Sequence, residues 1–253
     1  MKPYIVRFIS SRSGTGKTLV ASKIVDSLVK RGFPVGVIKH ATTGISLEEK
    51  DSEKYLRAGA TEVIVSNKEI TLAYNKGLVD DLGELVGLIS KPLIIAEGFK
   101  ESNVGDTVVV AKEIEDAAGL VTSSTIAVVV TESHTISENH QVDGAPILQL
   151  SQLDVLADRI IEKAVRYITN QLPGLNCGHC GLSTCEALAL RILKGEKASC
   201  PLSSQVKLSV NNIEIQLNPF VMNVVISVVE GLLRALKGVP KDIKEIELRI
   251  AMN

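Results

Sequence analysis

The eight residues "SRSGTGKT", Ser11 to Thr18, constrain the fold more than any other part of the chain. They follow "YIVRFIS", an apolar run with the composition of a buried strand. They precede "KTLVASKIVDSLVKRG", which has helical periodicity and ends at Gly32. A glycine-rich turn between a strand and a helix allows backbone N–H groups and the helix N-terminus to surround a phosphate. The sequence therefore predicts a phosphate-binding loop within an α/β fold.

Each residue type in this loop has an expected role. Gly14 and Gly16 allow the backbone to close around phosphate oxygens, Lys17 reaches the β- and γ-phosphates, and Thr18 binds Mg²⁺. Ser11 stands where the usual G-x-x-x-x-G-K-[ST] pattern has glycine, but the strand, loop and helix all agree with the prediction. The predicted nucleotide-binding residues are Ser13, Gly14, Thr15, Gly16, Lys17 and Thr18.

After this loop, apolar runs alternate with helical segments as far as residue 172. Strands are expected at "FPVGVIKH", "EVIVS", "TLAY", "PLIIAE", "DTVVVA" and "TIAVVV". Helices are expected near "SEKYLRAG", at "LVDDLGELVGLI" and in "SQLDVLADRIIEKAVRYITNQL". Helices between continuous apolar strands indicate a mostly parallel sheet covered by helices on both faces. The last helix ends at Pro173 and Gly174, where we place a domain boundary.

Polar residues end two of the expected strands. Glu97 ends the strand in "LIIAEGFKES", where phosphate-loop proteins place an acid that faces the metal and the attacking water. Lys39 and His40 end the strand in "GVIKHATTG", and the carboxyl edge of a parallel sheet lines the ligand crevice. Asp51 is expected to reach the metal through water. Thr18, Glu97 and Asp51 are therefore the predicted magnesium and catalytic residues.

Four segments together resemble one known family. Residues 1 to about 169 resemble the molybdopterin-guanine dinucleotide biosynthesis protein B family through "SGTGKT", "VIKHATTG", "KDSEKYLRAGA" and "IIAEGFK". The resemblance implies a dimeric GTP-binding adaptor with weak GTPase activity. Its partner would be the nucleotidyltransferase that joins GMP to molybdopterin in making the molybdenum or tungsten cofactor. The resemblance also adds Lys100 to Lys39 and His40 in the crevice, although "ATTG" is poorer in histidine than the family's segment after "KH".

Two features of the first part leave alternatives open. Arg12 either reaches the nucleotide of a partner subunit, as a basic residue does at this place in some dimeric phosphate-loop ATPases, or is an exposed, solvated arginine. "VVVTESH" contains Thr131 but lacks the lysine and aspartate of an Asn/Thr-Lys-x-Asp guanine-reading motif. The preference for GTP over ATP therefore depends on the resemblance.

The four cysteines have the spacing C-x2-C-x4-C-x14-C, with Pro201 directly after the last of them. Disulfides need an oxidising compartment, which nothing in the sequence supports. Three closely spaced cysteines and a distant one before proline are more typical of iron–sulfur ligation than of zinc. We predict that Cys177, Cys180, Cys185 and Cys200 hold a [4Fe–4S] cluster, with zinc as the alternative. Residues 174 to 202 resemble the small iron–sulfur domain of the corrinoid iron–sulfur protein's large subunit and of the Rnf complex B subunit.

The remaining residues are expected to form a β-β-α-β unit. "VKLSVNNIEIQL" indicates a hairpin around Asn211-Asn212, a helix follows from about Pro219 to Lys237, and "IKEIELRIA" indicates a strand. Charged residues interrupt "FVMNVVISVVEGLLRAL", so we expect a core helix rather than a membrane span. The predicted division is a phosphate-loop domain at 1–172, an iron–sulfur module at 173–202 and a C-terminal module at 203–253.

The net charge and the N-terminal segment limit the classes of function that we expect for this chain. The net charge is -1, which gives no electrostatic reason to expect a nucleic-acid or membrane surface. "MKPYIVRFIS" has Arg7 within its apolar run and is expected to be a strand, not a secretory signal. We expect a cytoplasmic homodimer that binds GTP and Mg²⁺ and serves the nucleotidyltransferase or a client molybdo- or tungsto-enzyme. The alternatives are an ATP-dependent electron-transfer or metallocentre-assembly protein that uses the cluster, and a small-molecule kinase.

Overall fold

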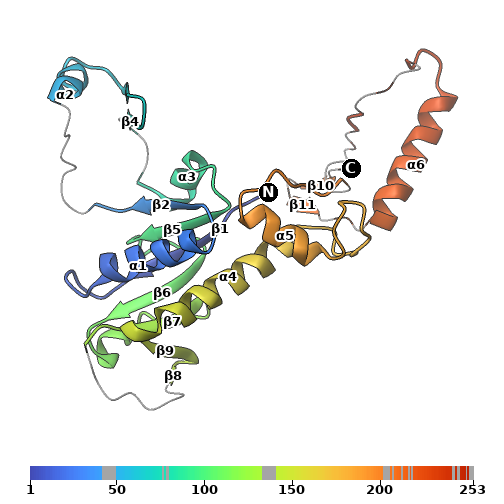
Figure 1. Ribbon diagram of the computed structural model, residues 1–253. Helices are drawn as coiled ribbons and strands as arrows, with labels where there is room; N and C mark the ends of the chain where they lie inside the picture. The colour runs from blue at the N-terminus through green and yellow to red at the C-terminus, as the bar shows by residue number, and fades with distance from the viewer. Residues whose placement is uncertain are drawn as a thin grey trace. The chain divides into compact units, whose positions relative to one another are not determined.

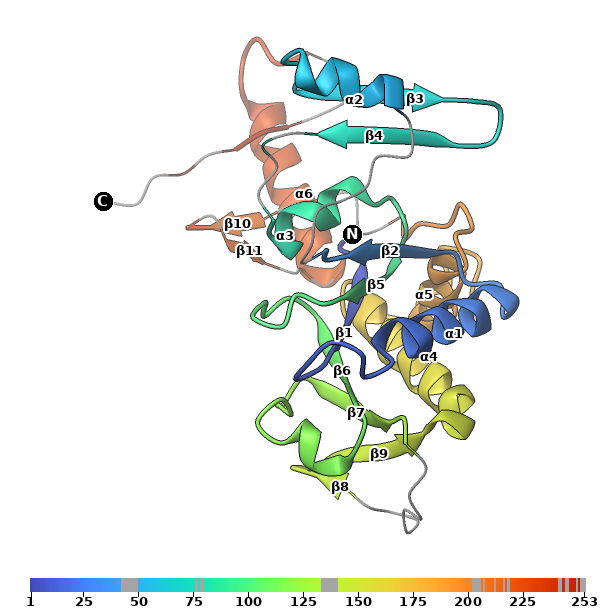
Figure 2. The ribbon, with the colours of Figure 1, turned by 90° about the vertical axis from the view of Figure 1, so that its left-hand side faces the viewer.

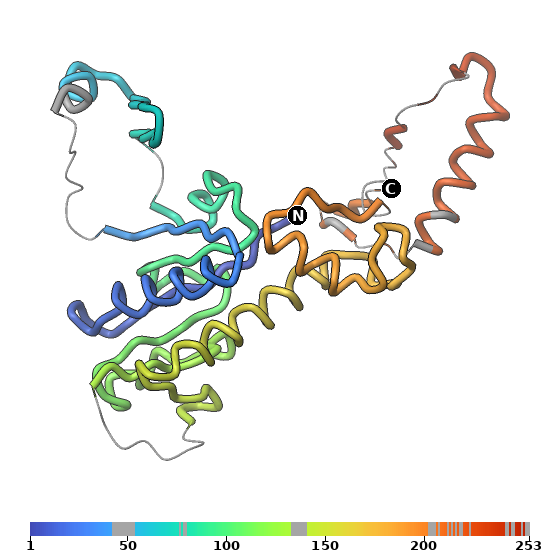
Figure 3. Tube along the Cα trace, in the orientation of Figure 1, coloured from blue at the N-terminus to red at the C-terminus, as the bar shows by residue number. Residues whose placement is uncertain are grey.

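The chain forms two compact units in the computed structural model (Figure 3). The first unit contains residues 1–168 and 189–197, and the second contains residues 169–188 and 198–253. These bounds differ from those of the three predicted parts, because residues 189–197 pack with the first unit. Where the functional domains begin and end stays a prediction. The structure describes residues 1–41, 50–75, 77, 80–132, 141–201, 206, 208–211, 213–215, 217, 219–240, 243, 246–248 and 250.

A seven-stranded sheet organises the first unit (Figure 1). The strand order is β2-β5-β1-β6-β7-β9-β8, and every neighbouring pair is parallel except β8 with β9. The mostly parallel sheet is therefore confirmed, with β8 and β9 as strands that the sequence did not predict. The strands are β1 (Tyr4–Ile9), β2 (Val35–Lys39), β5 (Leu93–Glu97), β6 (Asp106–Ala111), β7 (Thr125–Val130), β8 (Gln141–Val142) and β9 (Ala145–Gln149).

One face of the sheet is covered by α1 (Lys17–Lys30) and α4 (Leu153–Thr169). Arg31, at the end of α1, forms an ion pair with Asp154 at 3.0 Å, so the two helices are neighbours (Figure 1). The ring of Tyr4 in β1 lies 5.6 Å from that of Tyr167 in α4. The apolar stripe of each helix is buried, which accounts for the periodicity that predicted both helices.

Shorter elements cover the opposite face. Ile5 of β1 packs with Leu82 of α3 (Leu82–Leu85), which continues into the 3-10 turn η1 (Val86–Leu88). Ile9 packs with Ala117 of the 3-10 turn η2 (Ile114–Ala117). The helix expected at 78–89 is thus shorter than predicted. Asp81 caps the start of α3 by accepting a hydrogen bond from the Glu84 N–H at 3.2 Å, and the α-helix gives way to the 3-10 turn after Leu85. A third 3-10 turn, η3 (Leu150–Gln152), leads into α4.

Two predicted strands pair with each other and not with the main sheet. β3 (Glu62–Ser66) and β4 (Thr71–Asn75) form an antiparallel ribbon, and α2 (Lys50–Arg57) lies beside β3 (Figure 2). Ile64 of β3 is 73% exposed, so this ribbon is not part of the buried core.

The second unit contains the hairpin of β10 (Leu208–Val210) and β11 (Ile213–Ile215) and the helix α6 (Pro219–Ala235). The prediction that α6 is a core helix is wrong for most of its described side chains. Phe220 is 76% exposed and Leu232 is 61% exposed, whereas Met222 is buried. Val221, Val225, Val229 and Leu233 are half-buried, so the described residues cover one stripe of the helix only in part.

The fourth element of the predicted β-β-α-β unit is not seen in the described residues. Positions 243, 246–248 and 250 of the expected strand lie in irregular backbone, and its other positions are outside the described residues. Among the helices that the structure describes, none combines the length and the hydropathy required to cross a membrane.

Candidate functional site

The loop from Ser10 to Gly16 joins the carboxyl end of β1 to α1, at the edge of the sheet where phosphate loops lie. Gly14 and Gly16 have φ angles of 73° and 89°, and Gly16 is the N-cap of α1. These left-handed conformations favour glycine, as the motif predicted. The first turn of α1 carries no acidic residue, so the positive end of the helix dipole is free to favour an anion.

Thr131 contacts the backbone of this loop, and the sequence did not predict this contact. Its hydroxyl lies 3.0 Å from the carbonyl oxygen of Thr15 and 3.2 Å from that of Ala111. A Cβ added at Gly16 would lie 3.1 Å from the Thr131 Cγ2, so the loop and Thr131 are in close contact. Its position directly after the apolar strand β7 was the signal available in the sequence.

Lys17 is held against the loop. Its Nζ donates a hydrogen bond to the Ser10 Oγ at 2.6 Å and lies 3.4 Å from the Arg12 carbonyl oxygen. The Ser10 hydroxyl donates to the same carbonyl at 2.6 Å. The Thr15 hydroxyl is buried and has no hydrogen-bond partner among the described residues. The left-handed glycines, the lysine and this unsatisfied hydroxyl are chemically suited to phosphate groups.

Thr18, Lys39 and Glu97 meet beside this loop, as the strand-end argument predicted. The Thr18 hydroxyl donates to the Glu97 Oε1 at 2.6 Å, and the Lys39 Nζ lies 3.5 Å from that oxygen and 3.4 Å from the Thr18 Oγ1. Lys39 and Glu97 are partners in the register of β2 and β5. A hydroxyl and a carboxylate are oxygen ligands of the kind that Mg²⁺ takes. The pair therefore fits a metal bound together with phosphates.

His40 lies next to this cluster and has a partner that the sequence did not indicate. Its backbone N–H donates to the Glu97 carbonyl oxygen at 2.9 Å, and its Nε2 lies 2.7 Å from the Asp80 Oδ2. The His40 ring is 5.1 Å from the ring of Phe99. At Gly98, with φ 93°, an added Cβ would lie 2.9 Å from the His40 Cβ, so glycine is required there for close approach.

A buried arginine fixes the segment that follows Glu97. Arg7 of β1 donates to the carbonyl oxygens of Val104 at 2.9 Å and Phe99 at 3.1 Å, and to the Thr107 hydroxyl at 3.0 Å. Burial of the guanidinium lowers the pKa of Arg7 from its usual value. With three acceptors around a buried cation, the backbone between β5 and β6 has a defined path beside the site.

The side chains of three other predicted site residues make no described contact with Thr18, Lys39 or Glu97. Arg12 is paired with Asp116 of η2 at 3.0 Å, with 61% of its side chain exposed. Lys100 is an exposed residue of the turn after β5. Asp51 lies in α2, and its side chain is outside the described residues. The roles of all predicted site residues stay predictions.

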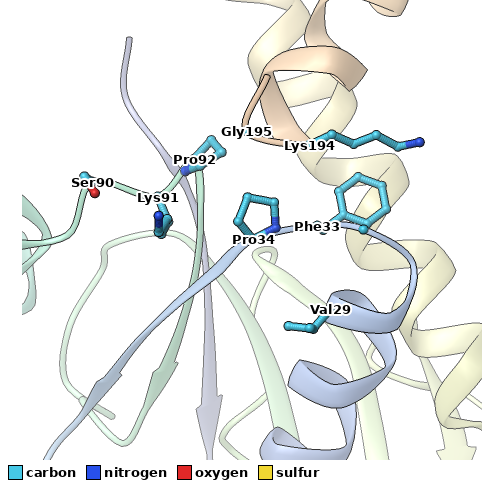
Figure 4. Close-up of a pocket in the computed structure, with 9 residues that line it drawn as sticks. Val29, Phe33, Pro34, Ser90, Lys91, Pro92, Lys194 and Gly195 are labelled. Carbon is cyan, nitrogen blue, oxygen red and sulfur yellow. The ribbon is translucent and has the colours of Figure 1, made fainter. Parts of the chain in front are cut away.

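A cavity of about 480 Å³ lies at the other end of the sheet, where β2 and β5 begin (Figure 4). Its lining includes Phe33 and Pro34 before β2, Pro92 before β5, and Lys194 and Gly195. None of its described lining residues belongs to the predicted nucleotide site. The phosphate loop and this cavity are therefore separate features of the first unit.

The four cysteines all belong to the second unit, and no disulfide joins them. Cys185 begins the helix α5 (Cys185–Leu193) and is buried, as is Cys200, whereas Cys180 is half-buried and Cys177 is exposed. Among the described residues, no three His, Cys, Asp or Glu side chains are grouped so that they could hold a metal ion. Four thiols match an iron–sulfur cluster in number and chemistry, and binding would have to draw them together.

Comparison with known proteins identifies relatives along most of the chain. A protein of Methanocaldococcus jannaschii named "Putative molybdopterin-guanine dinucleotide biosynthesis adapter protein" is 27% identical over 91% of this chain and 92% of its own length. The Escherichia coli "Molybdopterin-guanine dinucleotide biosynthesis adapter protein" is 27% identical over 59% of this chain and 87% of its own. The crystal structure of Bacillus subtilis MobB aligns with a TM-score of 0.50 and 25% identity, over 62% of this chain and 97% of that one.

Two family models match the two regions that the motifs had singled out. The model described as "Putative Fe-S cluster" matches residues 172–201, which contain all four cysteines. The model described as "Molybdopterin guanine dinucleotide synthesis protein B" matches residues 5–132, from β1 to the residue after Thr131. Because that match spans half of the chain and includes the phosphate loop, Lys39, His40 and Glu97, the chain belongs to the molybdopterin guanine dinucleotide synthesis protein B family.

Proposed function

We propose that this protein is a GTP-binding adaptor in the synthesis of the guanine dinucleotide form of the molybdenum or tungsten cofactor. Its partner is the nucleotidyltransferase or a client molybdo- or tungsto-enzyme, and it works as a cytoplasmic homodimer. The observation that carries the proposal is the meeting of Thr18, Lys39 and Glu97 beside a phosphate loop, in a chain whose relatives are named as adapter proteins of this synthesis.

The geometry supports binding and slow hydrolysis more directly than other chemistry. The loop backbone and Lys17 would hold the phosphates, and Thr18 and Glu97 would hold Mg²⁺, which when bound neutralises phosphate charge. Lys39 would add a second positive charge beside Thr18 and Glu97. In the present arrangement the Lys39 Nζ balances the Glu97 carboxylate, whose side chain is 13% exposed. Loss of this ammonium would leave a largely buried carboxylate without a cation.

The cysteine segment adds a second component to the proposal. We place one [4Fe–4S] cluster on Cys177, Cys180, Cys185 and Cys200, and such a cluster would supply one-electron redox chemistry. The match of residues 172–201 to an iron–sulfur family supports this assignment over zinc. The second candidate function is a metallocentre-assembly or electron-transfer protein that hydrolyses ATP, and the same match supports the cluster that this function would need.

Anaerobic purification of the full chain, with identification of the bound nucleotide and metal, tests both components. We expect GTP to compete better than ATP, and Lys17→Ala to weaken GTP binding about 10–100-fold, because it removes a charged hydrogen-bond donor. Lys23→Ala is the matched control, since Lys23 is an exposed lysine on the same helix. A clear preference for ATP would move the conclusion to the second candidate. Equal GTP affinity of the two variants would remove Lys17 from the site.

A further inference from the structure

Asn176, the residue before the first cysteine, joins the two ends of the cysteine loop. Its Oδ1 accepts a hydrogen bond from the backbone N–H of Cys185 at 2.8 Å. The two residues are nine positions apart, and Cys177 and Cys180 lie between them. One side-chain contact therefore closes a loop that carries three of the four thiols.

The same contact helps to define the start of α5. The Thr184 hydroxyl accepts a hydrogen bond from the Ala187 N–H at 3.1 Å, as the N-cap of the helix. The Cys185 N–H is another first-turn donor that has no carbonyl partner within the helix, and Asn176 satisfies it. The helix start, and with it the buried residue Cys185, is thus fixed relative to the segment that carries Cys177.

The middle of the loop is also ordered by its backbone. The Gly181 N–H donates to the Gly178 carbonyl oxygen at 2.8 Å, which closes a tight turn around Cys180. The φ angles of these two glycines are 77° and 80°. The loop backbone therefore has fixed ends and a fixed turn, although its thiols are not yet grouped as ligands.

We infer that Asn176 is a positioning residue for the cluster, holding the backbone of Cys177 beside the helix start that carries Cys185. This inference rests on the proposed function, because it assumes an iron–sulfur cluster on the four cysteines. Asn176 acts through the two cysteine backbones and is not itself a ligand. With the ends of the loop held together, insertion of the cluster has fewer backbone positions to order. Removal of such outer partners usually weakens metal binding by about 10–100-fold.

The uncharged side chain of Asn176 also matters for the reduction potential of the cluster. Aspartate at this position would accept the same N–H, because Asp and Asn are equally good helix caps. A cluster held by four thiolates is negatively charged and becomes more so on reduction. A carboxylate next to Cys177 would therefore disfavour the reduced state and lower the reduction potential, since net charge and hydrogen bonding set this potential.

Three variants of the full chain separate these effects. Asn176→Ala removes the acceptor, and Asn176→Asp keeps the acceptor but adds a charge. Asn176 has a left-handed backbone with a φ angle of 51°. Asn211→Ala is the matched control, because Asn211 has the same φ angle and is an exposed asparagine of the same unit. After anaerobic purification, iron and sulfide are quantified, iron loss to a chelator is followed by absorbance, and the midpoint potential is titrated with electron paramagnetic resonance detection.

We expect iron loss to be at least about tenfold faster in Asn176→Ala than in Asn211→Ala. Asn176→Asp should retain iron nearly as the unaltered chain does, with a more negative midpoint potential. Equal iron loss in Asn176→Ala and Asn211→Ala would overturn the positioning role. An unchanged potential in Asn176→Asp would overturn the role of neutrality, and this potential remains measurable even when Asn176→Ala assembles no cluster. Absence of iron from the unaltered chain would overturn the proposed cluster itself, which distinguishes the two failures.

Discussion

Replacing Gly16 with alanine should destabilise the first unit by an amount that depends on the side chain of Thr131. At φ 89° an L-residue is strained by about 1–2 kcal/mol. The new Cβ would also lie 3.1 Å from the Thr131 Cγ2, so Thr131 would have to shift by a few tenths of an ångström. That shift would weaken its hydrogen bond to the Thr15 carbonyl, a bond of a kind worth about 0.5–1.5 kcal/mol. The expected total is roughly 2–3 kcal/mol.

Gly14→Ala provides the matched comparison. Gly14 has φ 73°, and an added Cβ would meet nothing within 4 Å. This substitution should therefore cost only the backbone strain, about 1–2 kcal/mol. The difference between the two alanine variants then measures the contact with Thr131.

A double-mutant cycle with Thr131→Ser completes the test, because serine keeps the hydroxyl and removes the methyl group. In the Thr131→Ser background, the cost of Gly16→Ala should fall by about 0.5–1.5 kcal/mol. The free energy of unfolding is measured by denaturant titration of the nucleotide-free chain, and GTP affinity is measured in parallel. An equal cost of Gly16→Ala in both backgrounds would refute the argument that Thr131 supports the loop by direct contact.

The remaining predictions concern catalysis, pH and packing. Glu97→Gln should retain GTP but lose most Mg²⁺-dependent turnover, because the amide keeps the shape and loses the charge; unchanged phosphate release would exclude a metal role. Burial raises the pKa of Tyr4, and the nearby carboxylate of Asp106 raises it further. The unfolded chain therefore loses this proton first, and the free energy of unfolding should fall as pH rises above the ordinary tyrosine pKa of about 10. In unfolding titrations, Tyr4→Phe should reduce this loss of stability at alkaline pH. At neutral pH it should lower the free energy of unfolding by about 1.5–3 kcal/mol, because the hydrogen bond to Asp106 is lost. Leu193→Ala, at a fully buried position, should lower the free energy of unfolding by about 2–5 kcal/mol, and a loss below 1 kcal/mol would contradict its place in the core.

The middle of the sheet was predictable because β1, β5, β6 and β7 are continuous apolar runs buried on both faces. β9 was missed because Pro146 lies within it and the run "APILQL" is short, and proline usually argues against a strand inside a sheet. β3 and β4 were predicted as strands, but their pairing with each other was not. Nothing in a period-two pattern says which strand is the partner, and that choice depends on the rest of the fold.

In the candidate site, local motifs were predictable and distant contacts were not. The position of Lys17 and Thr18 at the start of a helix could be predicted because the phosphate loop is a contiguous pattern. The contacts of His40 with Asp80 and of Thr131 with Thr15 join positions 40 and 116 apart in the chain. The apolar pattern of α6 predicted a helix correctly, but whether such a helix is buried depends on what packs against it.

The C-terminal boundary of the first unit could not be predicted from the sequence pattern either, and it affects where the chain can be truncated. α4 ends at Thr169, and Pro173 and Gly174 are a clear break in the sequence pattern, yet residues 189–197 return to the first unit. Gly195 approaches Pro34 so closely that an added Cβ would lie 2.8 Å from the Pro34 Cγ, and Leu193 is fully buried. A chain ending at residue 172 would expose apolar surface that Leu193 now covers. Since α5 begins at Cys185 and ends at Leu193, one nine-residue helix carries both a candidate cluster ligand and part of the core of the nucleotide-binding unit.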